Sequence, residues 1–163
     1  MKDKPYPRKC PNCRERSLLA AVEDTTAELR HDGDPYTVTV PQLEVQVCTS
    51  CEVRNWPYEA SERVTDALRV SAGILMPAEI LAARLRLGAT PGEIAAHLGV
   101  LEAVYSRWES GGQLQSRMQD FTLRVYFANP DRFLRARDWP REPVALPHEE
   151  SLRFLDLKPS DAV

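Results

Sequence analysis

The sequence predicts an α+β fold, in which a small N-terminal β domain precedes an all-α domain. All four cysteines lie in two C-x-x-C pairs that flank a stretch of alternating β-branched residues, a pattern typical of strands. From residue 77 onward, the apolar residues recur instead at helical spacing. The 13 prolines are dense at both ends, but between residues 78 and 129 only Pro91 occurs, which fits a helical middle.

Length and composition limit the classes of protein to consider. With 163 residues, of which 43% are hydrophobic, the chain can form one domain or two small ones. Its apolar runs are far shorter than the roughly 18 residues of a membrane span, and no apolar stretch follows Met1 as in a secretory signal. We therefore expect a cytoplasmic protein with no membrane partner. The net charge of -3 argues against coating of nucleic acid by bulk charge and leaves a local binding face as the remaining option.

The cysteines predict a structural zinc site. Each C-x-x-C places two sulfurs on one tight turn, and two such turns can enclose Zn²⁺ in a tetrahedron of thiolates. The expected ligands are Cys10, Cys13, Cys48 and Cys51. The alternatives are a redox dithiol, which would need one such pair opening a helix, and two disulfides, which would need an oxidising compartment. A closed four-thiolate site has no open position for water, so we expect no enzyme activity from it.

A β-hairpin between the two cysteine pairs would bring them together. Residues 36–40 and 43–47 alternate apolar and polar side chains, residues 17–29 could supply an earlier strand, and residues 31–35 (HDGDP) are typical of a turn. We assign residues 1–56 to a zinc-binding β domain. Residues 57–76 follow as a linker helix with apolar residues at helical spacing.

The middle of the chain predicts a helix-turn-helix domain over residues 77–130. The expected helices cover residues 77–87, 91–98, 101–109 and 116–127. The second should begin at a capping box formed by Thr90 and Glu93, and Gly88 and Gly99 should end the first two. The last helix carries an apolar stripe of Met118, Phe121 and Val125.

Two short helices joined by a glycine turn form a unit with which many proteins read DNA. The exposed face of the third helix would enter the major groove, where Arg107 could bind guanine or phosphate. Free amides at Thr90 could receive a phosphate oxygen at the N-terminus of the second helix. The candidate DNA-binding residues are Thr90, Glu102, Ala103, Ser106 and Arg107.

The same helices also fit a bundle that binds no DNA. Between residues 77 and 127, five arginines are balanced by five acidic residues, so the domain has no surplus of positive charge with which to release counterions. Phosphate would repel Glu102 unless its carboxylate accepts a hydrogen bond from a cytosine amine.

Residues 87–100 (LGATPGEIAAHLGV) and 105–111 (YSRWESG) resemble the Xre/Cro-type helix-turn-helix family without a gap. With the two C-x-x-C pairs and the alternating valines that lead into the second pair, residues 8–130 are similar to the MqsA-type (YgiT-type) antitoxins. This resemblance implies a zinc-stabilised homodimer, joined through its helical domain, that represses its own operon by binding a palindromic operator DNA. It also implies a small messenger-RNA-cleaving ribonuclease toxin as a partner of the zinc domain.

Carried over by position, the resemblance assigns a base contact to Arg107 and an ion pair between helices to Arg84 and Glu109. The chain departs from the family where asparagine, glutamine and a polar helix cap are frequent, at Ala103, Pro91 and Leu101 respectively. These departures bear on operator affinity and sequence rather than on the fold.

Two functions rival a DNA-binding repressor. One is a protein-interaction adaptor built on the same modules without DNA binding, which Glu102, Ala103 and the balanced charge favour. The other is a thiol oxidoreductase.

The remaining aromatic and histidine residues are given structural roles. We expect His97 to be solvated on the outer side of its helix, and Trp56 and Trp139 to be packing anchors. Residues 131–163 form a proline-rich C-terminal extension. Its Phe154 and Leu155 could dock on a partner or on the core, or belong to a loosely ordered tail.

Overall fold

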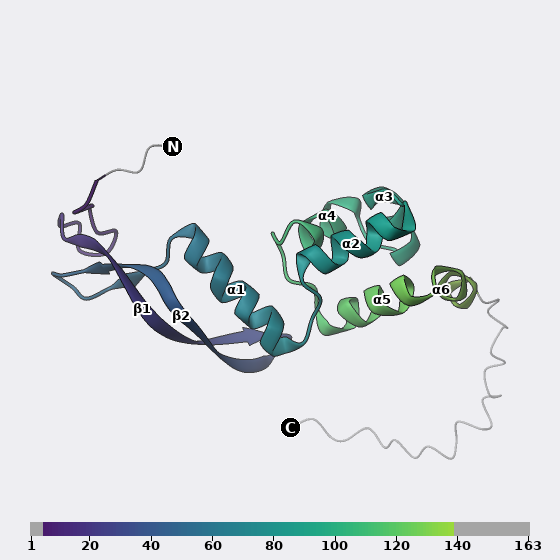
Figure 1. Cartoon of the computed structure of the whole chain (residues 1–163), viewed down its shortest axis with the longest axis horizontal. Coiled ribbons are helices and arrows are strands. Elements are labelled where there is room, and N and C mark those ends of the chain that lie inside the picture. Colours follow the sequence, from purple (N-terminus) through teal and green to yellow (C-terminus); the bar gives the residue numbers. More distant parts are fainter. Residues whose placement is uncertain (1–4, 139–163) are drawn as a thin grey trace, which may run out of the picture.

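The computed structural model describes residues 5–138 and has an α+β architecture, with an antiparallel three-stranded sheet followed by helices (Figure 1). The predicted Trp139, Phe154 and Leu155 roles lie outside the described residues. Within residues 5–138, every helix is too short or too polar to span a membrane. The elements are β1 (Leu18–His31), β2 (Asp34–Cys48), β3 (Arg54–Asn55), α1 (Tyr58–Ala72), α2 (Pro77–Leu87), α3 (Pro91–Leu98), α4 (Glu102–Glu109), α5 (Arg117–Ala128) and α6 (Pro130–Arg137).

A long twisted hairpin forms most of the sheet (Figure 1). β1 and β2 pair from Leu18 opposite Cys48 to His31 opposite Asp34. The connecting Asp32 and Gly33 both have positive φ, 51° and 86°, as the tight turn of a two-residue hairpin requires. The strand ends that carry the cysteine pairs therefore lie together at the opposite end of the hairpin.

The two alternating segments expected over residues 36–40 and 43–47 belong to one strand, β2, which contains a bulge. The register of the ladder shifts between Glu23 and Thr25, and Gln42 opposite this shift has a φ of 49°. The Gln42 amide donates to Oδ1 of Asp24 at 2.9 Å. Since an extra residue reverses the alternation, Val40 before the bulge and Leu43 after it are both buried on the same face.

Helix α1 belongs to the core of the N-terminal domain, whereas the sequence suggested only a linker helix. Ala60, Val64 and Leu68 are buried against apolar residues of β2, and Trp56 packs on the same cluster. The Arg63 guanidinium donates to the carbonyls of Pro41 and Gln42 at 2.6 and 2.7 Å and so holds α1 to the bulge.

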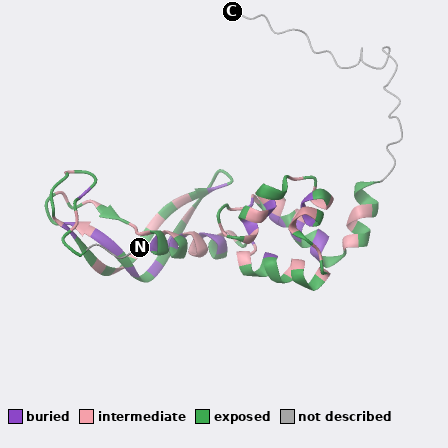
Figure 2. Ribbon diagram, turned by 90° about the horizontal axis from the view of Figure 1, so that it is seen from above, coloured by how far each residue is buried: buried purple, intermediate pink, exposed green. Residues whose placement is uncertain are grey.

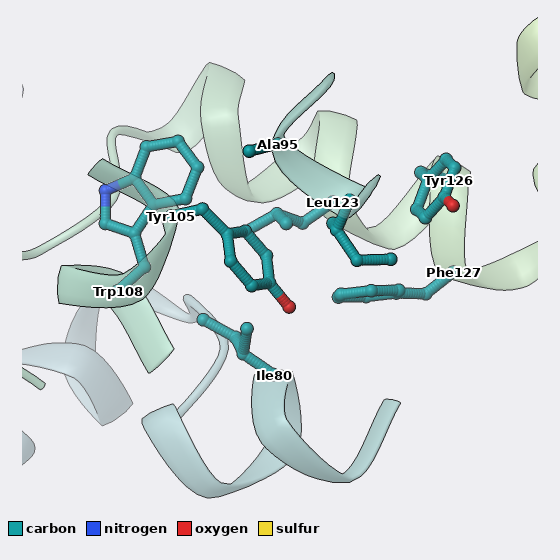
Figure 3. Packing of buried hydrophobic residues seen from close by; sticks show 8 residues of the cluster. Ile80, Ala95, Tyr105, Trp108, Leu123, Tyr126 and Phe127 are labelled. Carbon is teal, nitrogen blue, oxygen red and sulfur yellow. The ribbon is translucent and has the colours of Figure 1, made fainter. Parts of the chain in front are cut away.

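The helical domain has a second core of its own. Figure 2 shows the buried residues in two groups, one along the sheet and α1 and the other among the later helices. In the second group Tyr105 and Trp108 of α4 pack with Ile80 of α2, Ala95 of α3 and Leu123 of α5 (Figure 3). The sheet, α1 and these helices thus form two adjacent compact bodies.

Local capping chemistry fixes the ends of α2 and α3, at the residues the sequence indicates. Thr90 and Glu93 form the expected capping box. Gly88 and Gly99 end the two helices in the left-handed conformation, with φ of 64° and 71°. Gly99 also makes the tight turn that leads to α4.

Three features of the C-terminal helices differ from the sequence-based expectation or add to it. His97 was expected to be solvated, but it is half-buried. Its Nδ1 lies 2.8 Å from the Tyr126 hydroxyl. The extension expected from residue 131 starts inside α6, whose Phe133 packs edge-on against Tyr126. The stripe on α5 exists but points outward, with Met118 and Phe121 exposed to 71% and 62%.

Arg84 and Glu109 form a bidentate ion pair between α2 and the end of α4. The two guanidinium–carboxylate distances are 2.7 and 2.6 Å, and both side chains are largely buried. Arg84 also donates to the carbonyl of Ala89 at 3.1 Å. The hydrogen bonds from Arg84 hold the pKa of Glu109 below its ordinary value.

We predict that Glu109→Gln lowers the free energy of unfolding by about 1.5–3 kcal/mol at pH 7, because it removes a charged hydrogen-bond acceptor from Arg84. A carboxyl whose pKa is lowered by folding stabilises the protein above its unfolded pKa, and this contribution is lost as the pH falls through the folded pKa. The difference between wild type and variant should therefore shrink below about pH 4. Urea unfolding followed by tryptophan fluorescence measures it. The matched control is Glu28→Gln, at an exposed position of β1, and an equal effect of the two changes would contradict the prediction.

Candidate metal centre and helix-turn-helix face

Four cysteine sulfurs converge at the end of the hairpin opposite its turn. Cys10 and Cys13 precede β1, and Cys48 and Cys51 lie at the end of β2 and just beyond it. All four sulfurs lie within 4.8 Å of one another, and none is in a disulfide. The strand register causes this convergence, because it pairs Leu18 directly with Cys48.

The two cysteine pairs sit on matching backbone turns. The amide of Arg14 donates to the carbonyl of Cys10 at 3.0 Å, and the amide of Glu52 donates to that of Cys48 at 2.9 Å. Arg14 and Glu52 have φ of 67° and 58°, which is the left-handed conformation that closes such a turn. Each turn therefore directs both of its sulfurs to the same side.

The sulfur positions fit a tetrahedral metal ion. Bonds of about 2.3 Å from zinc to sulfur in a tetrahedron place the sulfurs about 3.8 Å apart. The Cys10–Cys51 and Cys13–Cys48 separations are 3.7 and 3.6 Å. The four cysteines can thus bind a metal ion such as zinc, and four thiolates would complete its coordination without leaving a position for a substrate.

Neighbouring hydrogen-bond donors favour the thiolate form at two of the cysteines, Cys48 and Cys51. The Ser17 hydroxyl lies 3.0 Å from the Cys48 sulfur and, with nearby backbone amides, lowers the pKa of Cys48 to about 6. The Asn12 side-chain amide donates to the Cys51 sulfur at 3.5 Å and lowers its pKa. At Cys13 the Glu15 amide favours the thiolate, but burial and the neighbouring sulfurs outweigh it and raise the pKa to about 11. The thiolate form is therefore favoured at Cys48 and Cys51 over Cys13.

The candidate DNA-binding residues on α4 share one outward side of the helical domain. Glu102, Ala103 and Arg107 are exposed and Ser106 is half-buried, while Tyr105 and Trp108 of the same helix face the core. The turn at Gly99 packs α3 closely against α4. On the inner side of α4, Tyr105 and Trp108 pack with residues of α2, α3 and α5 (Figure 3).

Thr90 does not provide the free amide that the sequence suggested. Its amide and hydroxyl both donate to Oε2 of Glu93, at 2.7 and 2.8 Å, because the capping box uses them. The carboxylate of Glu102 also approaches this end of α3. A Cβ added at Gly92 would lie 3.0 Å from the Glu102 Oε2 atom, so an acidic group stands where a phosphate would approach the helix N-terminus.

Sequence reasoning missed the donors around the sulfurs. Ser17 lies four residues after Cys13, and no spacing rule for thiolate sites singles it out. Only the pairing of β1 with β2 brings Ser17 beside Cys48. There the Ser17 carbonyl also accepts a hydrogen bond from the Thr49 amide at 3.0 Å. Asn12, inside the first C-x-x-C, was the only one of these donors whose position in the motif could have indicated its role.

Comparison with known protein families and with curated proteins found no match for this chain.

We predict that Ser17→Ala moves the pH midpoint of metal release upward and weakens binding at neutral pH by about tenfold, the lower end of outer-shell effects. Without the Ser17 hydroxyl the Cys48 pKa rises from about 6, so protons compete with the metal at higher pH. Zinc released during acid titration can be followed with a chromophoric chelator. The matched control is Ser50→Ala, an exposed serine on the second cysteine turn, and a shift in both variants or in neither would refute this role for Ser17.

Proposed function

We propose that this protein is an antitoxin-like, sequence-specific DNA-binding repressor with a structural zinc domain. The observation that carries the proposal is the helical domain, in which α3 and α4 meet at the Gly99 turn and present the exposed Arg107 on α4. Such a helix pair fits the major groove, with the second helix contacting base edges. The resemblance to Xre/Cro-type domains and MqsA-type antitoxins supports the same function.

Within this proposal Arg107 contacts a guanine edge or a phosphate, and Ser106 and Ala103 border the same groove. The Arg84–Glu109 ion pair holds α4 against α2. Glu102 limits the sequences that can be accepted, because it tolerates a cytosine amine and repels phosphate.

Zinc is the metal that best suits the four-cysteine site, and its role is structural. Thiolate donors in a tetrahedral arrangement favour zinc over harder cations such as Mg²⁺ and Ca²⁺. Among residues 5–138, the buried residues of the small core at this end of the hairpin are Cys10, Leu18 and Cys48, so the metal would supply much of its stability. No catalytic role follows, since the four sulfurs leave no open coordination position.

A homodimer would form through the outer face of α5. Met118, Phe121 and Val125 are exposed at positions i, i+3 and i+7, while the inner face of α5 carries Leu123 and Phe127 into the core. A helix that is apolar on both sides is typical of one covered on both sides. The same stripe on a second copy provides a self-complementary surface around a two-fold axis, which would place two α4 helices against successive turns of operator DNA.

A small ribonuclease toxin is a further proposed partner, and it rests on the resemblance to the MqsA-type antitoxins. The metal-binding domain would hold it, since the cysteine turns lie at the end of the hairpin that is remote from the helical domain (Figure 1). Co-expression with the product of a neighbouring reading frame tests this partner directly.

The alternative function is a protein-interaction adaptor that has lost DNA binding. The placement of the Glu102 carboxylate over Gly92 favours it, because this acidic group opposes a phosphate at the N-terminus of α3. Mobility-shift assays with the protein's own upstream DNA distinguish the two functions. A salt-sensitive shift supports the repressor, and its absence supports the adaptor.

We predict that Arg107→Ala weakens operator binding by about 10- to 100-fold, as loss of one base contact does, without a change in zinc content or thermal unfolding. Arg107 is exposed, so its removal should not disturb the core. Fluorescence anisotropy with labelled upstream DNA measures the affinity. Arg135→Ala, which changes an exposed arginine of α6, is the control. If the Arg107 variant bound DNA with wild-type affinity, Arg107 would not be part of the DNA interface.

We predict that Phe121→Asp converts the dimer to a monomer, because it places a charge in the centre of the apolar stripe. Phe121 is 62% exposed, so the fold should stay within about 0.5 kcal/mol of wild type. Sedimentation velocity over a concentration series measures the association. The control is Leu85→Asp on α2, at a residue of similar exposure, 61%, on another face. Dissociation by the Leu85 change alone would place the interface on α2.

A further inference from the structure

The two bodies of the protein are joined through few contacts, and several of these contacts meet on one segment. Among the described elements, α2–α6 make only sparse contacts with the sheet and α1. A cleft of about 360 Å³ lies between α1 and the loop from α4 to α5. The relative placement of the bodies therefore depends on a small number of named side chains.

The hairpin turn closes on Arg117, the first residue of α5. The Asp32 carboxylate accepts the backbone amide of Arg117 at 2.5 Å. The guanidinium group pairs with Asp34 at 2.8 Å, donates to the Tyr36 hydroxyl and lies 5.7 Å from the centre of the Tyr36 ring. Three side chains of the hairpin thus converge on one residue of the helical domain.

This combination is stronger than any one of its parts. An exposed ion pair such as Arg117–Asp34, with both side chains about half exposed, contributes little by itself. Asp32, however, also caps the N-terminus of α5, where a carboxylate satisfies a free amide and interacts favourably with the helix dipole. Asp32 lies in the two-residue turn and Asp34 is the first residue of β2, so the hairpin ladder already restricts both acids and little freedom is lost when they engage Arg117.

The other end of the same segment is held by α1. Arg69 is only 3% exposed. Its guanidinium donates to the Gly111 carbonyl at 2.9 Å and to Asp66 at 2.7 Å. Leu114, between these two attachments, packs into the core of the sheet and α1. The N-terminal body therefore holds residues 111–117 at both ends and in the middle.

Residues 111–117 in turn contact the arginine proposed to read DNA. The Gln113 amide donates to the Arg107 carbonyl at 3.2 Å. A Cβ added at Gly112 would lie 3.8 Å from the Arg107 Cγ atom. The loop is thus hydrogen-bonded to the backbone of Arg107, and Gly112 lies beside the first carbons of its side chain.

We propose that the hairpin turn is an interdomain latch, closed by Asp32, Asp34 and Tyr36 on Arg117, and that it positions Arg107 for DNA. Arg117 and Arg69 are positioning residues that act through the loop and do not touch DNA. The part of this proposal that concerns DNA rests on the proposed function, whereas the latch itself does not. A partner that binds the hairpin turn would open the latch and lower DNA affinity through the same loop.

The first experiment tests the latch without DNA. ¹⁵N relaxation of the full zinc-bound chain should give one rotational correlation time for both bodies in the wild type. Arg117→Gln and, as an independent change, Asp34→Asn should give two shorter and different values, with the chemical shifts of both cores unchanged. Arg135→Gln on α6 makes the same chemical change away from the latch and should behave as wild type. A single shared correlation time in the Arg117 variant overturns the proposal.

The second experiment tests the link to Arg107. Arg117→Gln should weaken operator binding by at least about fivefold, the lower range of coupling between sites, while the slope of log affinity against log salt stays as in wild type. A slope reduced by about 0.9 would mean that Arg117 contacts a phosphate itself and would overturn the positioning role. Failure of the wild type to bind DNA would defeat the proposed function, while the relaxation experiment would still decide whether the latch exists.

Discussion

The pairing register of β1 with β2 is the constraint on which the remaining structure depends. One ladder places Leu18 opposite Cys48 at one end and His31 opposite Asp34 at the other. A slip of one residue would turn every side chain of a strand to the opposite face. Such a slip would expose the apolar face of β2 that packs under α1 and would move Cys48 away from the first cysteine pair. The bulge at Gln42, held by Asp24 and by Arg63 of α1, makes the register unique because it fits at only one place along the hairpin.

Because of this register, the two ends of the hairpin make different contacts. At one end the small core of Cys10, Leu18 and Cys48 buries too little apolar surface to be stable alone, which is the setting in which proteins use a structural metal. In the middle, α1 supplies an apolar core that needs no metal. At the other end the turn reaches the first residue of α5. The four-cysteine cluster and the part that contacts the helical domain therefore lie at opposite ends of one pair of strands.

The features that could be predicted from sequence are those whose causes are local. The ends of α2 and α3 follow from Gly88, Gly99 and the Thr90–Glu93 box, and the sulfur cluster follows from the spacing of two tight turns. By contrast, the two alternating segments form one bulged strand because β1 places Asp24 opposite Gln42. The sequence of β2 alone does not show this partner. The partner of His97 is 29 residues away, and the partners of Arg117 are more than 80 residues away. Neither pairing leaves a periodic signal, because each depends on how two complete elements pack.

The balanced charge of the helical domain determines what kind of DNA contact it could make. A protein with surplus arginines gains affinity from released counterions wherever it touches the backbone. Here Glu102 offsets the charge of Arg107 on the same helix, so affinity has to come from a few contacts made in the right geometry. Ordering a long arginine side chain costs about 1.5–2 kcal/mol, and this cost falls when the surroundings already restrict the side chain. The loop beside Arg107, held by Arg69, Leu114 and Arg117, provides such a restriction without adding positive charge to the face. A domain of this kind would depend on its N-terminal neighbour for affinity, although the neighbour itself touches no DNA.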